Sequence, residues 1–199
     1  MEPARERHGM GMKQTLEVLN QMVSDEIIGS YAIGGAIAAF NYIEPASTDD
    51  LDILVSFDSP STPSRLVTLT PILAYLSEKG YAEHRKEGIL IEDWPVRFFP
   101  VASALDAEAL TGAQPIDIEM SPGAGGVSAR VLTAEHVMAT ALGIGRPKDH
   151  IGLNQFIEAG AFDAPILREI LQRHGLQAKW LRFCGRFEIA DPLKTERES

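Results

Sequence analysis

Two aspartates separated by one residue, Asp50 and Asp52, are the side chains of this sequence best suited to chemistry. They begin the stretch DLDILV, whose β-branched and apolar residues favour a strand. Because side chains alternate between the two faces of a strand, both carboxylates are expected on one face, with Leu51 and Ile53 on the other. Neighbouring carboxylates repel each other unless a positive charge lies between them, and Mg²⁺ accepts one or two carboxylates together with substrate phosphates.

A pair of glycines, Gly34 and Gly35, precedes the aspartates and begins an apolar stretch over residues 36–42 that is typical of a helix. Glycine lets a phosphate approach the backbone closely, and the start of a helix offers N–H groups to it. We therefore expect the glycines and the aspartates to form one site that holds a phosphate beside a cation. The competing interpretation is that the aspartates belong only to a solvated turn and a half-exposed strand.

The string GGAIAAFNYIEPASTDDLDILV resembles the signature of the nucleotidyltransferase (polymerase beta-like) superfamily, and is most similar to its AbiEii/AbiGii-type branch, which includes toxins of toxin–antitoxin systems. The resemblance is carried by residues 28–60. It implies Mg²⁺-dependent transfer of a nucleoside monophosphate from an NTP to a hydroxyl of RNA or protein, with an antitoxin as a partner. It also implies that Gly34 and Gly35 hold the nucleotide, while Asp50 and Asp52 are the catalytic, metal-binding carboxylates, with two Mg²⁺ ions in a catalytic site.

A second group of polar residues, Arg146, Lys148 and Asp149, lies at the expected start of a later helix. In the AbiEii-type branch a Lys or Arg followed by Asp near such a helix is part of the active-site region. The resemblance therefore implies that these residues bind the nucleotide, with Lys148 at the phosphates and Asp149 orienting it. An ammonium near a triphosphate is physically sensible. The alternative is an exposed helix N-terminus in which Asp149 is only a cap.

The resemblance also implies a third carboxylate on the strand expected over residues 96–101, but this sequence has Arg97 there. An arginine is always charged and cannot ligate Mg²⁺. Glu92 or Asp93 would be another source of a carboxylate, unless they form a plain charged turn. The second hypothesis is therefore a catalytically degenerate protein that binds a nucleotide or a partner without turnover. A third is a structural interaction domain that binds neither metal nor NTP.

Composition restricts the class of protein. Of 199 residues, 18 are Lys or Arg and 28 are Asp or Glu, and the net charge of −10 argues against broad electrostatic binding of DNA, though not against a local basic groove. The single cysteine, Cys184, excludes an internal disulfide or a cysteine-rich zinc site and is expected to be a packed residue. No apolar stretch reaches the length of a membrane span, so we expect a soluble, cytoplasmic protein that makes no contact with a membrane. His136 and His150 are expected on helix surfaces, and Phe98 and Phe99 in the core.

The order of elements predicts an α/β (α+β) fold, a mixed sheet flanked by helices. We expect a nucleotidyltransferase-like domain over residues 11–131 and a helical C-terminal subdomain over 132–190 packed on it. Loops are expected at 58–63 and, as the connection of a hairpin within 113–131, at 123–126. The helices are expected at 11–23, 36–42, 70–80, 105–110, 133–142, 149–158, 164–174 and 177–183, with Thr70 and Thr133 as N-caps. Besides the two strands of that hairpin, strands are expected at 31–33, 51–57, 81–85, 88–91 and 96–101.

Overall fold

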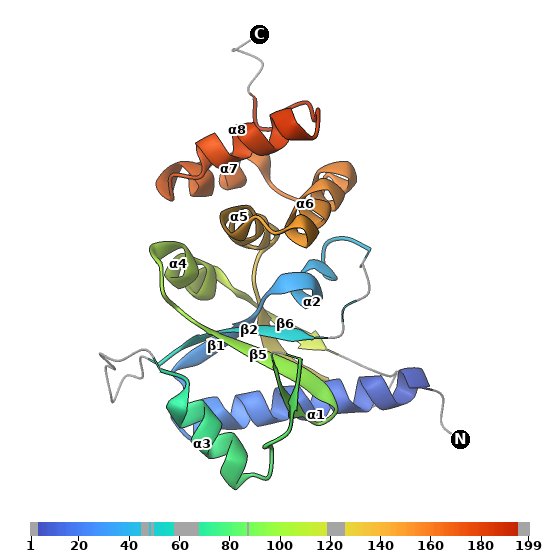
Figure 1. Cartoon of the computed structure of the whole chain (residues 1–199), viewed down its shortest axis with the longest axis vertical. Coiled ribbons are helices and arrows are strands. Elements are labelled where there is room, and N and C mark those ends of the chain that lie inside the picture. The colour runs from blue at the N-terminus through green and yellow to red at the C-terminus, as the bar shows by residue number, and fades with distance from the viewer. Residues whose placement is uncertain are drawn as a thin grey trace.

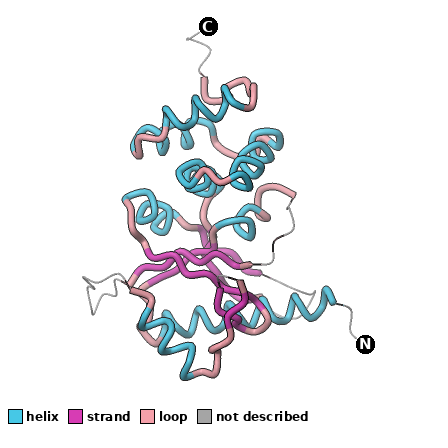
Figure 2. The backbone as a smooth tube through the Cα atoms, viewed as in Figure 1, coloured by secondary structure: helices cyan, strands magenta, loops and turns pink. Residues whose placement is uncertain are grey.

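The structure is a computed structural model that describes residues 4–44, 48, 50–57, 68–86, 88–118 and 126–194, with the backbone alone for residues 4–10. The described residues form eight helices and one seven-stranded sheet (Figures 1 and 2). The helices are α1 (Ala4–Ser24), α2 (Gly35–Ala39), α3 (Thr70–Glu78), α4 (Ala104–Gly112), α5 (Ala134–Ile144), α6 (Pro147–Ala159), α7 (Ala164–Arg173) and α8 (Gln177–Arg186). The strands are β1 (Ser30–Ile33), β2 (Leu51–Ser56), β3 (His84–Arg85), β4 (Gly88–Ile91), β5 (Trp94–Pro100), β6 (Gln114–Ile118) and β7 (Val127–Val131).

The sheet is mixed, and its strands are ordered β3-β4-β5-β2-β1-β7-β6. Three hairpin-like pairs, β3–β4, β4–β5 and β6–β7, are antiparallel. In the centre, β2 runs antiparallel to β1 and parallel to β5. The parallel pair is important for the site, because it sets the residues of β2 and β5 side by side although they are about 45 positions apart in the sequence.

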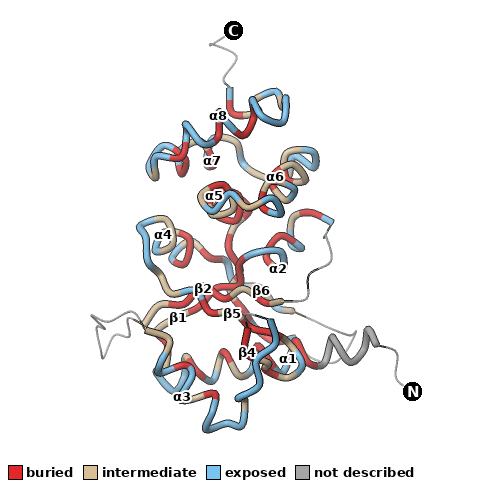
Figure 3. The backbone as a smooth tube through the Cα atoms, viewed as in Figure 1, coloured by how far each residue is buried: buried red, intermediate tan, exposed pale blue. Residues whose placement is uncertain are grey.

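Helices cover both faces of the sheet. Figure 1 shows α1 and α3 on one face and α2 and α4 on the other, with α5 to α8 stacked beyond α2 and α4. The inner side of α1 is fully buried at Leu16, Leu19 and Met22. Figure 3 shows buried residues along the central strands and along α5, and one hydrophobic cluster includes side chains of the sheet and of the C-terminal helices. The predicted fold class, a mixed sheet flanked by helices with a helical C-terminal part, is confirmed.

Several boundaries differ from the predicted ones. Helix α1 begins at Ala4 rather than at residue 11. The N-cap of α3 is Leu69, so that Thr70 and Pro71 are already inside the helix, where proline needs no hydrogen-bond donor. Thr133 is the N-cap of α5 as predicted, and its hydroxyl accepts from the backbone N–H of His136. The loops predicted at 58–63 and 123–126 lie outside the described residues, apart from Gly126.

His136 is buried rather than on a helix surface, in a cluster that joins α4, α5 and α7. Its Nδ1 is 2.9 Å from the hydroxyl of Thr133, and its Nε2 is 3.5 Å from Glu108 Oε1. Glu108 also lies 2.7 Å from His174 Nε2 and accepts a 3.0 Å hydrogen bond from Arg173 Nη2. This carboxylate therefore connects the sheet-covering helix α4 to the C-terminal helices.

Cys184 is buried, as predicted. The ring of His150 packs against Phe183 and Phe187, and His150 itself is partly buried. Within the described part of the chain, no helix combines the length and the apolar character that crossing a lipid bilayer requires.

Candidate functional site

Arg97 on β5 lies opposite Asp52 on β2 in the parallel register. Its Nε donates a 2.8 Å hydrogen bond to Asp52 Oδ1, and its Nη2 is 2.6 Å from the same oxygen. The same Nη2 is 3.0 Å from Asp50 Oδ2. Both aspartates point to the same face of β2, as predicted, and the positive charge between them is the guanidinium of Arg97.

These three side chains are largely shielded from solvent, with exposed fractions of 11% for Arg97, 22% for Asp50 and 17% for Asp52. Burial raises the pKa of Asp52, while the guanidinium of Arg97 and the ammonium of Lys148 act in the opposite direction. The second oxygen of Asp50, Oδ1, accepts a 3.0 Å hydrogen bond from Thr48. The carboxylates are therefore held by protein donors from two sides.

The glycine pair lies directly beside Asp52. The backbone N–H of Gly34 donates a 2.8 Å hydrogen bond to the carbonyl of Asp52. Gly35 has a φ of +59°, and a Cβ at this position would overlap Asp52 Oδ2. Only glycine therefore satisfies both the left-handed backbone and the close approach of the carboxylate. The structure brings the two predicted pairs together; that the glycines hold a nucleotide remains a prediction.

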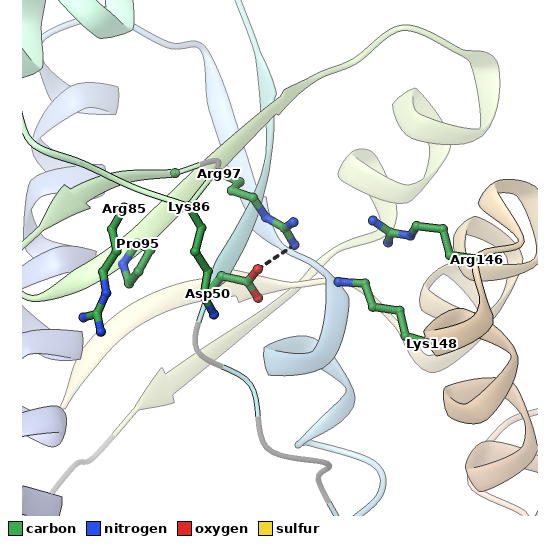
Figure 4. Close-up of a pocket in the computed structure, with 8 residues that line it drawn as sticks. Asp50, Arg85, Lys86, Pro95, Arg97, Arg146 and Lys148 are labelled. Carbon is green, nitrogen blue, oxygen red and sulfur yellow. Dashed lines mark ion pairs between the residues drawn. The ribbon is translucent and has the colours of Figure 1, made fainter.

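A cleft of about 330 Å³ opens over this site (Figure 4). Figure 4 shows Arg146 and Lys148 extending from the start of α6 toward Asp50 and Arg97. On the opposite side Lys86 ends beside Asp50, and Arg85 lies further out, near Pro95. The lining residues are Asp50, Arg85, Lys86, Gly88, Pro95, Arg97, Arg146 and Lys148. Five of these eight carry a positive charge and one a negative charge, so the cleft is locally cationic in a chain whose net charge is −10.

Asp149 does not orient Lys148. Its carboxylate accepts from the backbone N–H of Arg146 at 2.9 Å, from Nε of the same residue at 2.9 Å, and from Nη2 at 3.0 Å. Asp149 thus caps α6 and fixes the guanidinium of Arg146, and these hydrogen bonds raise the pKa of Arg146. Asp149 is therefore a cap, as the alternative interpretation expected, and it also positions a cation of the cleft. That this group binds a nucleotide remains a prediction.

Glu92 and Asp93 form the two-residue turn between β4 and β5, with φ values of 47° and 71°. Glu92 accepts a short hydrogen bond from the hydroxyl of Tyr81, and neither acid lines the cleft. The plain turn is therefore the correct interpretation of these residues.

Sequence reasoning missed Arg85 and Lys86 as cleft residues. The hairpin that carries them was predicted, with Glu87 of its turn outside the described residues. The missing information was the position of this hairpin: β4 pairs with β5 from Trp94 to Val96, which places the hairpin turn beside Arg97. The sequence did offer one indication: Arg85 and Lys86 are adjacent cations in a hairpin that directly precedes the strand of Arg97.

The residues present do not fit a pair of Mg²⁺ ions in this arrangement. The position expected to supply a third carboxylate is Arg97, and its guanidinium occupies the space between the two aspartates. Among the described residues, no group of three or more His, Cys, Asp or Glu side chains is arranged to hold a metal ion. A divalent ion would have to displace an arginine that is already ion-paired with both of its ligands.

Solved structures identify the architecture. The chain is similar to the crystal structure of an antigenic nucleotidyltransferase-like protein from Paracoccidioides brasiliensis, with a TM-score of 0.51 and 14% sequence identity over 87% of this chain and 88% of that chain. The fold is nucleotidyltransferase-like. No protein-family model and no curated protein sequence matches the chain. At this identity the likeness establishes the fold, so the activity has to be argued from the site itself.

Proposed function

We propose that this protein binds the triphosphate of a nucleotide in its cationic cleft without transferring the nucleotidyl group. The observation that carries the proposal is the guanidinium of Arg97, paired with both Asp50 and Asp52 where this fold would otherwise hold a metal ion. With its charge in that place, one of the two carboxylate charges is already offset from within the protein, and Lys148 and the neighbouring cations line the cleft beside the pair.

The ligand is inferred from the charge and the size of the cleft. Lys86, with Arg85 further out, lines one wall of the cleft, and Arg146 and Lys148 line the other. Guanidinium and ammonium groups are the side chains that bind phosphate oxygens most strongly, arginine through paired N–H donors. A volume of about 330 Å³ lies at the lower end of the range for small-molecule sites, which suits a triphosphate with the rest of the nucleotide extending outward.

The test is isothermal calorimetry with ATP, once in excess Mg²⁺ and once in EDTA. We expect the dissociation constants in the two buffers to agree within about threefold. Lys148→Ala should weaken binding by about tenfold, the loss of one charge-assisted contact. Lys79→Ala is the matched control, because it removes the same charge from the C-terminus of α3, on the opposite face of the sheet (Figure 1).

Incubation with labelled NTPs and with RNA or protein acceptors should give no labelled product. The proposal is refuted if binding requires Mg²⁺ and is abolished in Asp50→Asn/Asp52→Asn. It is also refuted if the wild type binds no nucleotide, a result that would favour a structural interaction domain.

A second candidate is the Mg²⁺-dependent transfer of a nucleoside monophosphate from an NTP to a hydroxyl of RNA or protein, with the toxin role and the antitoxin partner of the AbiEii-type branch. The observation in its favour is that Asp50 and Asp52 share one face of β2 beside Gly35. In this candidate the aspartates would hold Mg²⁺ and Arg97 would have to release them. The Mg²⁺ dependence of binding separates the two candidates.

A further inference from the structure

Phe99 is exposed although it was expected in the core. Its exposed fraction is 43%, whereas its neighbour Phe98 is 9% exposed on the other face of β5. Strand β4 pairs with β5 only as far as Val96. Beyond that residue, the described part of the sheet covers β5 on the β2 side alone. Phe99 lies in this part of β5, and its ring is open to solvent.

Phe99 lies on the same face of the strand as Arg97, because the two residues are separated by one position. Two positions along a strand correspond to about 6.5–7 Å. The guanidinium carbon of Arg97 is 5.7 Å from the centroid of the Phe99 ring, so the arginine that pairs with the aspartates also contacts this ring. Pro95, one step further back on the same face, lines the cleft.

We infer that Phe99 is the surface on which the nucleobase of the bound nucleotide stacks. The inference rests on the proposed binding of a triphosphate in the cleft and specifies what binds next to it. The face of β5 presents, in order, Pro95 at the cleft, Arg97 at the carboxylates, and an exposed aromatic ring. A nucleotide has the corresponding order, with an anionic phosphate chain at one end and a flat π-system at the other.

A single aromatic ring also predicts how the site discriminates between ligands. Stacking depends on the π-face that every base has, and not on the hydrogen-bonding edge that distinguishes one base from another. We therefore expect all four NTPs to bind, with purines tighter than pyrimidines because of their larger ring area. We also expect nucleotides to bind more tightly than inorganic tripolyphosphate, which carries the same phosphates and no base.

The experiment compares ATP with tripolyphosphate by calorimetry in EDTA for the wild type and three variants at Phe99. Phe99→Ala and Phe99→Leu should weaken ATP binding by about tenfold, within the range for loss of one base–aromatic stack. Both should leave tripolyphosphate binding unchanged, and Phe99→Trp should retain ATP binding. Leu73→Ala is the control, because Leu73 has a similar exposed fraction of 44% on α3, at the opposite face of the sheet.

The outcomes separate the two proposals. If the wild type binds neither ligand, the proposed function is refuted. If tripolyphosphate binds and Phe99→Ala leaves ATP binding unchanged, only the stacking inference is refuted. It is equally refuted if Phe99→Ala weakens both ligands to the same degree, because the ring would then act only by supporting Arg97. Thermal unfolding of each variant confirms that the compared proteins are folded.

Discussion

Replacing Arg97 by methionine tests the central feature of the site. Methionine keeps much of the length and the apolar packing of the side chain but removes the positive charge. The variant leaves Asp50 and Asp52, 22% and 17% exposed, without the guanidinium that lies 3.0 Å and 2.6 Å from them. Because burial already raises the pKa of Asp52, loss of the opposing charge of Arg97 should raise it further.

The expected loss of stability follows from this geometry. Removal of one partner from a buried ion pair costs about 3–5 kcal/mol, and the residual exposure of the carboxylates favours the lower end, about 3 kcal/mol. For a chain of 199 residues this corresponds to a fall of roughly 6–12 °C in the melting temperature. The loss should be smaller at acidic pH. A carboxyl with a raised pKa in the folded state stabilises the protein below its pKa in the unfolded chain, and this contribution disappears as pH rises through the folded pKa.

The assay is urea unfolding followed by circular dichroism, at pH 7 and pH 5. The matched control is Arg97→Met/Asp50→Asn/Asp52→Asn, in which neutral amides replace the carboxylates. We expect this triple variant to recover most of the loss, because no unpaired charge remains. If Arg97→Met is within about 0.5 kcal/mol of the wild type at pH 7, the change would be no larger than that of an ordinary surface substitution and the reasoning is wrong.

The same variant reveals whether the two carboxylates are able to hold a divalent ion once the arginine is absent. A ligand that binds only the folded state stabilises it by about 2.7 kcal/mol at a concentration 100 times its dissociation constant. We expect Mg²⁺ to raise the melting temperature of Arg97→Met and to leave that of the wild type unchanged, at matched ionic strength. Equal responses of the two proteins would contradict the assignment of Arg97 to the place of the metal.

Three further predictions concern groups outside this ion pair. Burial lowers the pKa of His136 below 6.5. For Glu108, burial alone would raise the pKa, but the hydrogen bonds from His174 and Arg173 outweigh it and hold the pKa below 4.5. Because the unfolded chain then binds more protons at these two groups, their contribution to the free energy of unfolding should fall as the pH drops from 6.5 through 4.5. Urea titrations of the wild type and of His136→Gln/Glu108→Gln across this range measure that contribution as the difference between the two proteins. Gly35→Ala should cost about 1–3 kcal/mol because of its left-handed backbone, and the paired Gly34→Ala, with its nearest neighbour at 3.5 Å, should cost less in the same unfolding assay. Burial raises the pKa of Cys184 to about 11, so its thiol should react with iodoacetamide at pH 8 far more slowly in the native protein than in urea; equal rates would contradict it.

The local features of the site could be predicted from the sequence because each depends on neighbouring residues. Alternation along one strand is sufficient to place Asp50 and Asp52 on the same face. The glycine pair followed by an apolar stretch likewise marks the start of α2 without knowledge of the rest of the chain. The mixed α/β fold could be predicted for the same reason, because periodicity and turn residues identified most of the helices and strands.

The features that could not be predicted depend on which elements become neighbours. The apolar stretch VRFFPV predicts Phe99 in the core, but its ring is exposed on the face of β5 opposite to that of the buried Phe98. The sequence pattern predicts His136 on the surface of its helix. It is buried because α4 and α7 pack against α5. Propensity and periodicity contain no information about either contact.

Because β2 and β5 pair in parallel, the type of residue at position 97 determines what the site is able to bind. Position 97 lies opposite Asp52, so its side chain determines whether the two carboxylates face a positive or a negative neighbour. A carboxylate there would complete a site that requires divalent ions to offset its charge. The arginine instead removes one negative charge from the site and supplies one positive charge from the protein itself. The two candidate functions therefore differ in whether Arg97 stays paired with the aspartates or releases them to Mg²⁺. A wild type that responds to Mg²⁺ as Arg97→Met does would favour release, and a response of the variant alone would favour the stable pair.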